Sequence, residues 1–243
     1  VTLNSPSDRN SLSVALITAL GSVLRELDSD PTETVAIVIT GYAPGQSFSS
    51  GFNVAEMAAL PAHDIQKALD EFVTSIDNLS TPTIAAVAGT AFGGGCELAL
   101  ACDIIYCTKD TRFALPEVKL GLLAAGGGLR RLSRWVGTGR AAILALTGCE
   151  WTGQDAEKWG MVKECLPSWC DCSAIYCAQM IAANSIPAVR ATKRLLKASA
   201  DAGSKEILEL EKQIFRDLLN SEEHFARRDA WLNRKKLSKC QGI

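Results

Sequence analysis

The sequence predicts an α/β fold in which covered strands alternate with helices and a purely helical region follows. Apolar, β-branched runs such as Val35–Thr40 and Thr83–Ala88 are continuous, which is typical of strands covered on both faces. Amphipathic helical patterns lie between these runs, as in folds built around a covered sheet. Strand signals stop after residue 166, so we expect an α/β core over residues 1–166 and a helical subdomain over residues 167–243.

The first third of the chain alternates strands and helices. Val1–Leu3 reads as the end of a strand, and Val35–Thr40 reads as a covered strand. Between them, apolar residues recur at helical spacing from Ser11 onwards, and Pro31 ends this helix. Gly41–Asn53 is rich in glycine and serine and predicts an irregular loop. A short helical turn at Val54–Leu60 and an amphipathic helix at Asp64–Leu79 are expected next.

An apolar stretch from Thr81 to Cys107 holds the most informative local pattern. A strand leads into three consecutive glycines, Gly93–Gly95, and then into a helix at Cys96–Ala101. This helix carries Glu97 in its first turn, where free backbone N–H groups and the helix dipole favour an anion. The same N–H groups suit a developing oxyanion. The sequence therefore places one acid among apolar residues and beside free donors.

The remaining elements continue the alternation until residue 166 and are then helical. The expected strands are Asp103–Cys107, Arg112–Leu115 and Met161–Cys165, and the expected helices start at Gly126–Gly128, at Arg140 and at Thr152, the last with capping-box spacing to Asp155. The helical region comprises Asp171–Asn184, Pro187–Ala202, Ser204–Leu219 and Glu222–Lys235, each with an apolar stripe.

Composition excludes several classes of protein. The chain has 243 residues, 47% of them hydrophobic, and a formal net charge of −2, so it can bury a core and has no basic footprint for nucleic acid. The basic run Arg234–Lys236 reads as a solvated end. Glycines, Glu97 and Asp103 interrupt the apolar stretch, so we expect no membrane span, which needs about 20 apolar residues in a row.

Cysteine usage points to a reducing compartment. The chain has nine cysteines, an odd number, and several lie inside apolar runs where a free thiol packs like a small hydrophobic group. The denser set of Cys165, Cys170, Cys172 and Cys177 does not have the spacing of a zinc site, and no histidine is near, so we expect no metal. The mitochondrial matrix or the cytoplasm is the expected location.

Two carboxylates are the candidates for chemistry. The sequence has no G-x-S-x-G elbow, no phosphate-binding P-loop and no H-E-x-x-H motif, and His63 and His224 are its only histidines. Glu97 and Glu117 both lie beside apolar residues, where a carboxyl group can act as acid or base near neutral pH. From the residues alone, a helix N-terminal charge or a solvated side chain remains the alternative for each acid.

Five short motifs follow one another along the chain: Phe48–Asn53 (FSSGFN), Pro82–Gly89 (PTIAAVAG), Ala91–Ala99 (AFGGGCELA), Cys102–Ile104 (CDI) and Phe113–Glu117 (FALPE). In order and spacing they resemble the crotonase superfamily of enoyl-CoA hydratases and isomerases. The resemblance implies repeated ββα units as a catalytic core over residues 1–166. It also implies a helical oligomerisation region over residues 167–243, which forms trimers that usually pair into hexamers.

The resemblance also implies a binding site. By this resemblance, the backbone N–H groups of Ser50 and Gly94 would form an oxyanion hole for the thioester carbonyl. Gly51, Phe52 and Asn53 would join these two residues in binding the substrate. This role would explain why both donors lie in loops rich in glycine.

By the same resemblance, Glu97 and Glu117 correspond to the two catalytic glutamates of the hydratases. Together they would hold a water, add its hydroxyl at the β-carbon and supply the α-proton. The implied function is a 2-enoyl-CoA hydratase without a cofactor, since CoA is part of the acyl-CoA substrate. A methylglutaconyl-CoA hydratase, an enoyl-CoA isomerase and a non-catalytic acyl-CoA-binding or scaffold subunit are the open alternatives.

Three departures from the family pattern bear on substrate choice more than on the reaction. Asn53 stands where family members usually have Asp, and Ala124–Ala125 stands where they have Pro-Gly. The loss of proline frees φ and restores an N–H donor in a segment that, by the resemblance, lines the acyl pocket. Ala226–Arg227 replaces the usual Glu-Gly near the C-terminus. Acyl chain length is therefore left open, as is the choice between trimer and hexamer.

Overall fold

The computed structural model describes residues 1–41, 47–168, 170–199, 204–228 and 230. Contacts divide the chain into two compact units, Val1–Met180 and Ile181–Ile243. The first unit contains every strand found in the described residues, and the second unit is helical where it is described. The functional boundary expected between residues 166 and 167 stays a prediction.

The first unit is built around a five-stranded parallel sheet with the order β1-β2-β4-β6-β9. All five residues of the central strand β4 are buried, which explains the continuous apolar run in its sequence. Strand β9 begins at Glu164 and not at Met161 as expected. The strands are β1 Thr2–Leu3, β2 Ile37–Gly41, β4 Thr83–Val87, β6 Ile104–Thr108 and β9 Glu164–Leu166.

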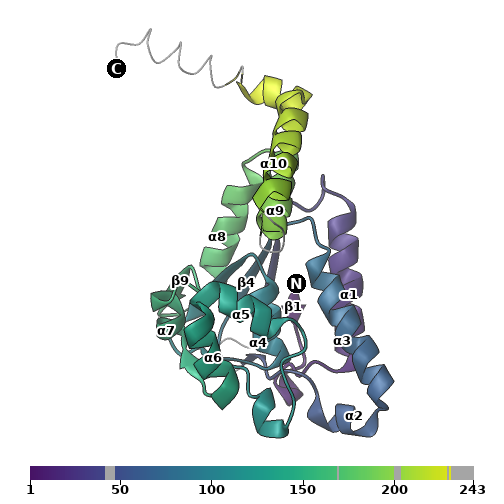
Figure 1. The fold of residues 1–243 in the computed structure, drawn as a ribbon, viewed down its shortest axis with the longest axis vertical. Helices are drawn as coiled ribbons and strands as arrows, with labels where there is room; N and C mark the ends of the chain where they lie inside the picture. The colour runs from purple at the N-terminus through teal and green to yellow at the C-terminus, as the bar shows by residue number, and fades with distance from the viewer. Residues whose placement is uncertain (42–46, 169, 200–203, 229, 231–243) are drawn as a thin grey trace. The chain divides into compact units, whose positions relative to one another are not determined.

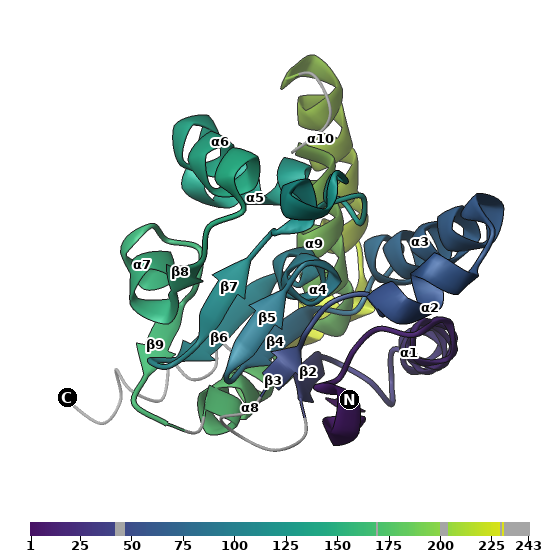
Figure 2. The same ribbon diagram turned by 90° about the horizontal axis from the view of Figure 1, so that it is seen from below.

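A second, four-stranded sheet has the order β3-β5-β7-β8, and its last strand is antiparallel to its neighbour (Figure 2). The expectation of an irregular loop over Gly41–Asn53 is wrong at Ser47–Ser49, which form β3, while residues 42–46 lie outside the described part. Strand β3 pairs with β5 through Ser47 and Thr90. The strands are β3 Ser47–Ser49, β5 Thr90–Phe92, β7 Arg112–Ala114 and β8 Trp151–Thr152.

The two sheets are linked by a repeated unit. A strand of the first sheet is followed by a short strand of the second sheet and then by a helix, as in β2-β3-α2 and β4-β5-α4. The predicted α/β fold of ββα units is thus confirmed. The helices that begin in the first compact unit are α1 Val14–Ser29, α2 Val54–Ala59, α3 Ala62–Asp77, α4 Gly94–Ala101, α5 Gly128–Val136, α6 Thr138–Thr147, α7 Gly153–Lys158 and α8 Cys170–Ala182. This unit also has two short 3₁₀ turns, η1 Pro6–Asp8 and η2 Glu117–Leu120.

Helix starts follow the capping signals of the sequence. The side chain of Ser13 accepts a hydrogen bond from the N–H of Leu16, so α1 begins at Val14 and not at Ser11 as expected. At α7 the predicted capping box is present, because Thr152 Oγ1 accepts from the Asp155 N–H at 3.1 Å and Asp155 Oδ2 accepts from the Thr152 N–H at 3.1 Å. Helix α1 packs along α3 (Figures 1 and 2).

Side chains from both sheets and from α1 and α4 form one apolar core. Leu24, Ile39, Phe48, Leu98 and Phe113 are each 0% exposed and belong to it. The first turn of α4 is part of this buried region, so the elements that pack most tightly are also those that carry the predicted acid. The core therefore fixes the position of the α4 N-terminus.

The second unit contains α9 Ile186–Ser199 and α10 Ser204–Leu219, which pack against each other. Residues 222–228 are also helical, and the remainder of the expected helix Glu222–Lys235 lies outside the described residues, apart from residue 230. The predicted C-terminal helices are thus confirmed where they are described. Within those described ranges, no single helix is long and apolar enough to cross a membrane, and α8 and α9 pass such a test only when they are counted together as a bent pair.

Candidate active site

A cavity of about 200 Å³ in the first unit brings most of the predicted site residues together. Its lining includes Ser50, Gly51, Phe52, Gly94, Glu97 and Glu117. Asn53 does not line it and instead caps α2, since its Oδ1 accepts a hydrogen bond from the Glu56 N–H at 3.1 Å. Apolar side chains such as Met57 and Leu69 complete the wall. The cavity is therefore an apolar pocket with two carboxylates in it.

Glu97 is held in the cavity wall by the starts of two helices. Its side chain is 0% exposed, and it lies in the first turn of α4, where its own N–H donates to the Gly93 carbonyl. Its Oε1 accepts a hydrogen bond of 2.8 Å from the N–H of Gly128, the first residue of α5. Its Oε2 is buried and has no hydrogen-bond partner among the described residues. One carboxylate oxygen is thus fixed, and the other is available to a ligand.

The surroundings of Glu97 bring it into the range of acid and base catalysis. Burial raises the pKa of Glu97 to about 7, the Gly128 N–H opposes this shift, and the nearby carboxylate of Glu117 adds to it. Near neutral pH the group therefore populates both its protonated and its ionised form, which suits proton transfer.

Glu117 reaches the same cavity from the second sheet. It is the first residue of η2, directly after β7 and Pro116, and a Cβ atom on Gly93 would lie 3.1 Å from its Oε1. Its Oε2 is buried without a hydrogen-bond partner in the described residues, and burial raises the pKa of this carboxyl as well. The structure therefore brings together the two predicted acids, each with one unpaired oxygen.

The glycine-rich loop after β3 lies directly against the start of α4. At Gly51, where φ is +94°, an added Cβ atom would lie 2.6 Å from the Phe92 carbonyl oxygen and 3.2 Å from the Gly94 nitrogen. Only glycine permits this approach, because the left-handed conformation and the close backbone both exclude a side chain. Gly94 is the first residue of α4, so its N–H has no acceptor within the helix. A donor is therefore free where the two loops meet.

The second predicted donor requires a correction. The N–H of Ser50 donates to the Arg9 carbonyl oxygen at 3.0 Å, so it is already used. The N–H of Phe52, in contrast, has no acceptor among the described residues, although Leu12 hydrogen-bonds to the residues on either side of it. Sequence reasoning missed this difference because the partner of Ser50 is far away in the sequence.

By the resemblance, the segment at Ala124–Ala125 lines the acyl pocket, but sequence reasoning missed that the glycines after it contact Glu97. Gly126–Gly128 reads as a helix start in the sequence, but its last N–H holds Glu97, and Arg131 from the same helix donates to the Gly126 carbonyl at 2.6 Å. The only sequence signal was a run of three glycines where one would suffice to begin a helix. This loop is therefore part of the candidate site.

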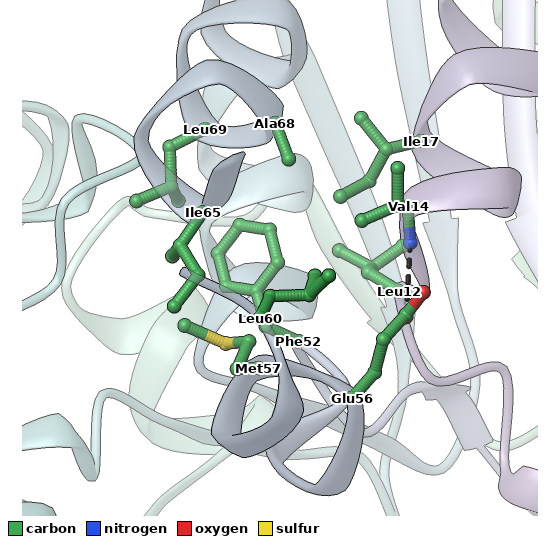
Figure 3. A pocket seen from close by; sticks show the side chains of 10 residues that line it. All are labelled: Leu12, Val14, Ile17, Phe52, Glu56, Met57, Leu60, Ile65, Ala68 and Leu69. Carbon is green, nitrogen blue, oxygen red and sulfur yellow. Dashed lines mark hydrogen bonds between the residues drawn. The ribbon is translucent and has the colours of Figure 1, made fainter. Parts of the chain in front are cut away.

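A second, much smaller apolar cavity of about 20 Å³ lies next to the first (Figure 3). In Figure 3 a wall of Phe52, Met57, Ile65 and Leu69 faces Leu12, Val14 and Ile17 of the α1 start. The four residues of this wall also line the larger cavity, so they separate the two spaces. At the edge, Glu56 Oε2 accepts a hydrogen bond of 3.1 Å from the Val14 N–H.

Most of the cysteines in the described residues are buried. Cys96, next to Glu97, is fully buried, and burial raises its pKa well above the usual value, as expected for a packing residue. Of the denser set, Cys165, Cys170 and Cys177 are buried and Cys172 is exposed. Across the described residues, no group of three or more His, Cys, Asp or Glu side chains is placed to hold a metal ion. Cys240 lies outside these residues.

Comparison with known proteins identifies the family of the chain. A family profile described as Enoyl-CoA hydratase/isomerase matches residues 1–238. A probable enoyl-CoA hydratase of Mycobacterium bovis is 37% identical over 228 residues, which cover 92% of this chain and 86% of that protein. A mitochondrial enoyl-CoA hydratase of Pongo abelii is 37% identical over 219 residues, which cover 88% of this chain and 74% of that protein. The crystal structure of an enoyl-CoA hydratase from Bacillus anthracis superposes with a TM-score of 0.90 at 30% identity, covering 96% of this chain and 91% of that one.

The burial of Glu97 predicts a pH-dependent cost in stability. Its pKa rises from 4.5 to about 7 on folding, so the folded state binds more protons between these values and the free energy of unfolding falls as pH rises through them. Glu97→Gln removes this titration. Relative to wild type, the variant should gain up to about 3 kcal/mol between pH 4.5 and pH 8, measured by urea unfolding at both pH values.

An exposed residue provides the control for this measurement. Glu26→Gln, measured in parallel, removes a carboxyl on the solvent side of α1 and reports the stability effect of the same substitution at an exposed position. Parallel stability curves for wild type and Glu97→Gln would mean that Glu97 ionises in the folded protein as it does in the unfolded chain.

Proposed function

Because the chain belongs to the enoyl-CoA hydratase/isomerase family, we propose that it adds water across the double bond of a 2-enoyl-CoA thioester in the cavity that holds Glu97 and Glu117. The observation that carries this proposal is a pair of carboxylates on the wall of one apolar cavity, each with one buried oxygen that has no hydrogen-bond partner among the described residues. A water molecule held between two such oxygens has a base on one side and an acid on the other.

The backbone donors bind the reacting carbonyl. The thioester oxygen accepts hydrogen bonds from the free N–H groups of Gly94 and Phe52, and the latter replaces Ser50 in this role. These donors stabilise the negative charge that develops on the oxygen when the β-carbon is attacked. Removing one donor of this kind typically raises a barrier by about 3 kcal/mol. Ser50 and Gly51 line the cavity beside them.

The two carboxyl groups carry the protons. One ionised carboxylate accepts a proton from the bound water as its hydroxyl bonds to the β-carbon, and a protonated carboxyl delivers a proton to the α-carbon. One water is consumed, and its hydroxyl group and the new hydrogen add to the same face of the double bond. A pKa of about 7 for Glu97 allows both protonation states near neutral pH.

The alternative functions require fewer acid and base groups than this site contains. An isomerase moves a proton between two carbons of its substrate and needs one base, and a non-catalytic binding subunit needs none. The presence of two acids in one cavity, each with a buried oxygen that lacks a hydrogen-bond partner among the described residues, therefore favours hydration. The proposed chemistry needs no resident cofactor, since CoA is part of the substrate. A reducing compartment, the mitochondrial matrix or the cytoplasm, fits the cysteine side chains that are buried in the described residues, such as Cys96 and Cys107.

We expect purified protein to hydrate crotonyl-CoA, followed as the loss of enoyl-thioester absorbance. Glu97→Gln and Glu117→Gln should each lower kcat by about 10²–10⁴-fold, because each removes a proton carrier and leaves the amide in its place. Glu26→Gln, exposed on α1, should leave kcat unchanged.

Two results would count against the proposal. A wild-type protein that binds acyl-CoA but hydrates none of a panel of short and medium enoyl-CoAs would favour a binding subunit. A glutamine variant with wild-type turnover would remove that glutamate from the mechanism.

The wall between the two cavities predicts how chain length is limited. Met57 is a flexible part of this wall, and shortening it joins the larger cavity to the apolar space beside α1. We expect Met57→Ala to raise kcat/KM for decenoyl-CoA relative to crotonyl-CoA by about 10-fold, since each buried methylene contributes 10- to 200-fold in such pockets. Rates across a series of acyl chains measure this ratio.

Leu60→Ala is the matched control, because Leu60 lines only the smaller cavity and its truncation leaves the wall intact. It should change the ratio by less than the Met57 variant does. If both variants keep the wild-type chain-length profile, the acyl group does not reach this wall.

We further propose that the protein forms trimers or hexamers through its second unit. Leu196, Phe215 and Leu219 are 68%, 64% and 43% exposed, and apolar side chains of this size usually mark an interface when they gather on a surface. Light scattering at micromolar concentration should give three or six times the mass of the chain.

Leu196→Glu combined with Phe215→Glu should lower that mass, whereas the matched charge change Lys212→Glu, at a polar exposed position, should not. A monomer in the wild-type sample would contradict the proposal.

A further inference from the structure

We propose that Arg131 is a positioning residue that fixes the Gly126–Gly128 loop against the carboxylate of Glu97. The inference rests on the proposed role of Glu97 in hydration and concerns how this carboxylate is held. The sequence patterns identify the loop only as the start of a helix, and neither Arg131 nor Asp77 carries a predicted role.

Arg131 is a buried cation with two defined partners. It lies near the start of α5 and is 7% exposed. Its Nη1 donates to the Gly126 carbonyl oxygen at 2.6 Å, and its Nη2 donates to Oδ1 of Asp77, the last residue of α3, at 2.5 Å. A buried charge is tolerated only when it is paired and hydrogen-bonded. The guanidinium therefore ties the end of α3 to the loop before α5.

The loop fits closely between Glu97 and Arg131. A Cβ atom added to Gly126 would lie 2.8 Å from Oε2 of Glu97, and one added to Gly128 would lie 2.8 Å from Oε1. One added to Gly127, where φ is +85°, would collide with Nη1 of Arg131. The backbone of this loop thus contacts the carboxylate on one side and the guanidinium on the other, so a displacement of Arg131 reaches Glu97 directly.

The loop also aims a hydrogen-bond donor. The Gly128 N–H that binds Oε1 of Glu97 is the first N–H of α5, where the helix dipole favours a negative charge. The Gly126 carbonyl, two residues earlier, is held by Arg131. If that carbonyl is released, the Gly128 N–H loses its fixed direction, and Oε2 of Glu97 is no longer presented to the cavity in one position.

Arg131 further supplies a positive charge near the acid. The charged or titratable groups that face Glu97 are Arg131 from α5, Glu117 from η2 and the thiol of Cys96 beside it on α4, while β3 and β5 contribute no charged side chain. Glu117 raises the pKa of Glu97, and Arg131 lowers it. Loss of Arg131 therefore shifts the carboxyl toward its protonated form in addition to loosening it.

Kinetics of Arg131→Gln and Arg131→Lys test the inference. We expect Arg131→Gln to lower kcat on crotonyl-CoA by about 10²-fold, similar to the loss of one preorganised donor, with KM changed by less than threefold. Arg131→Lys, which keeps the charge but not the planar fork, should be intermediate. Circular dichroism checks that both variants fold.

A double-mutant cycle separates positioning from general damage. In a Glu97→Gln background, Arg131→Gln should cost less than threefold, because the residue acts through Glu97. Arg130→Gln is the matched control, since Arg130 precedes Arg131 and also contacts Asp77, at 3.4 Å, but its side chain is 45% exposed. It should stay within twofold of wild type. Equal losses by Arg131→Gln in both backgrounds would overturn the inference.

A measurement without substrate keeps this inference distinct from the proposed function. The carboxyl ¹³C signal of Glu97, assigned by its loss in Glu97→Gln, reports the pKa of this group in the ligand-free protein. We expect its midpoint to rise by at least half a pH unit in Arg131→Gln and to stay near the wild-type value in Arg130→Gln. An unchanged midpoint in Arg131→Gln would overturn the inference, whether or not the wild type hydrates enoyl-CoA.

Discussion

The burial of one carboxylate, that of Glu97, is the constraint on which the site depends. The starts of α4 and α5 meet at this group and offer backbone N–H groups in place of water. Because burial removes this carboxyl from water, its pKa rises to about 7, which costs stability and at the same time makes it a usable acid or base. Gly126 and Gly128 have no side chain because a Cβ atom at either position would lie 2.8 Å from an oxygen of this carboxylate.

The two-sheet architecture explains how the other parts of the site reach Glu97. Strands β2, β4 and β6 of the parallel sheet are each followed by a short strand of the second sheet, and the segments after β3, β5 and β7 carry the loop at Gly51, the glycines before α4 and Glu117 respectively. These three strands lie side by side, so their ends come together although they are far apart in sequence. The same arrangement places Phe52, Gly94 and the two acids on the wall of one cavity.

Much of this fold could be predicted because its signals are local. The buried strand β4 is a continuous apolar run, and α1 and α3 have clear helical periodicity. The capping box of α7 is a pattern within four consecutive residues. Strands β3 and β5 could not be predicted, since each has three residues, and β3 contains two serines. Their order comes from pairing with each other and with β7, which local propensity does not encode.

The sequence by itself determined the α/β class and the helical C-terminal region, and it made the two acids candidates, because apolar periodicity and an acid beside apolar residues are properties of neighbouring residues. The tertiary structure alone decided which groups surround those acids. In the folded chain the Ser50 N–H donates to the Arg9 carbonyl, and the Phe52 N–H has no acceptor among the described residues. Arg131 binds the Gly126 carbonyl in the loop that holds Glu97. These outcomes depend on which distant backbone groups are satisfied on folding, and a pattern along the chain carries no information about such pairings.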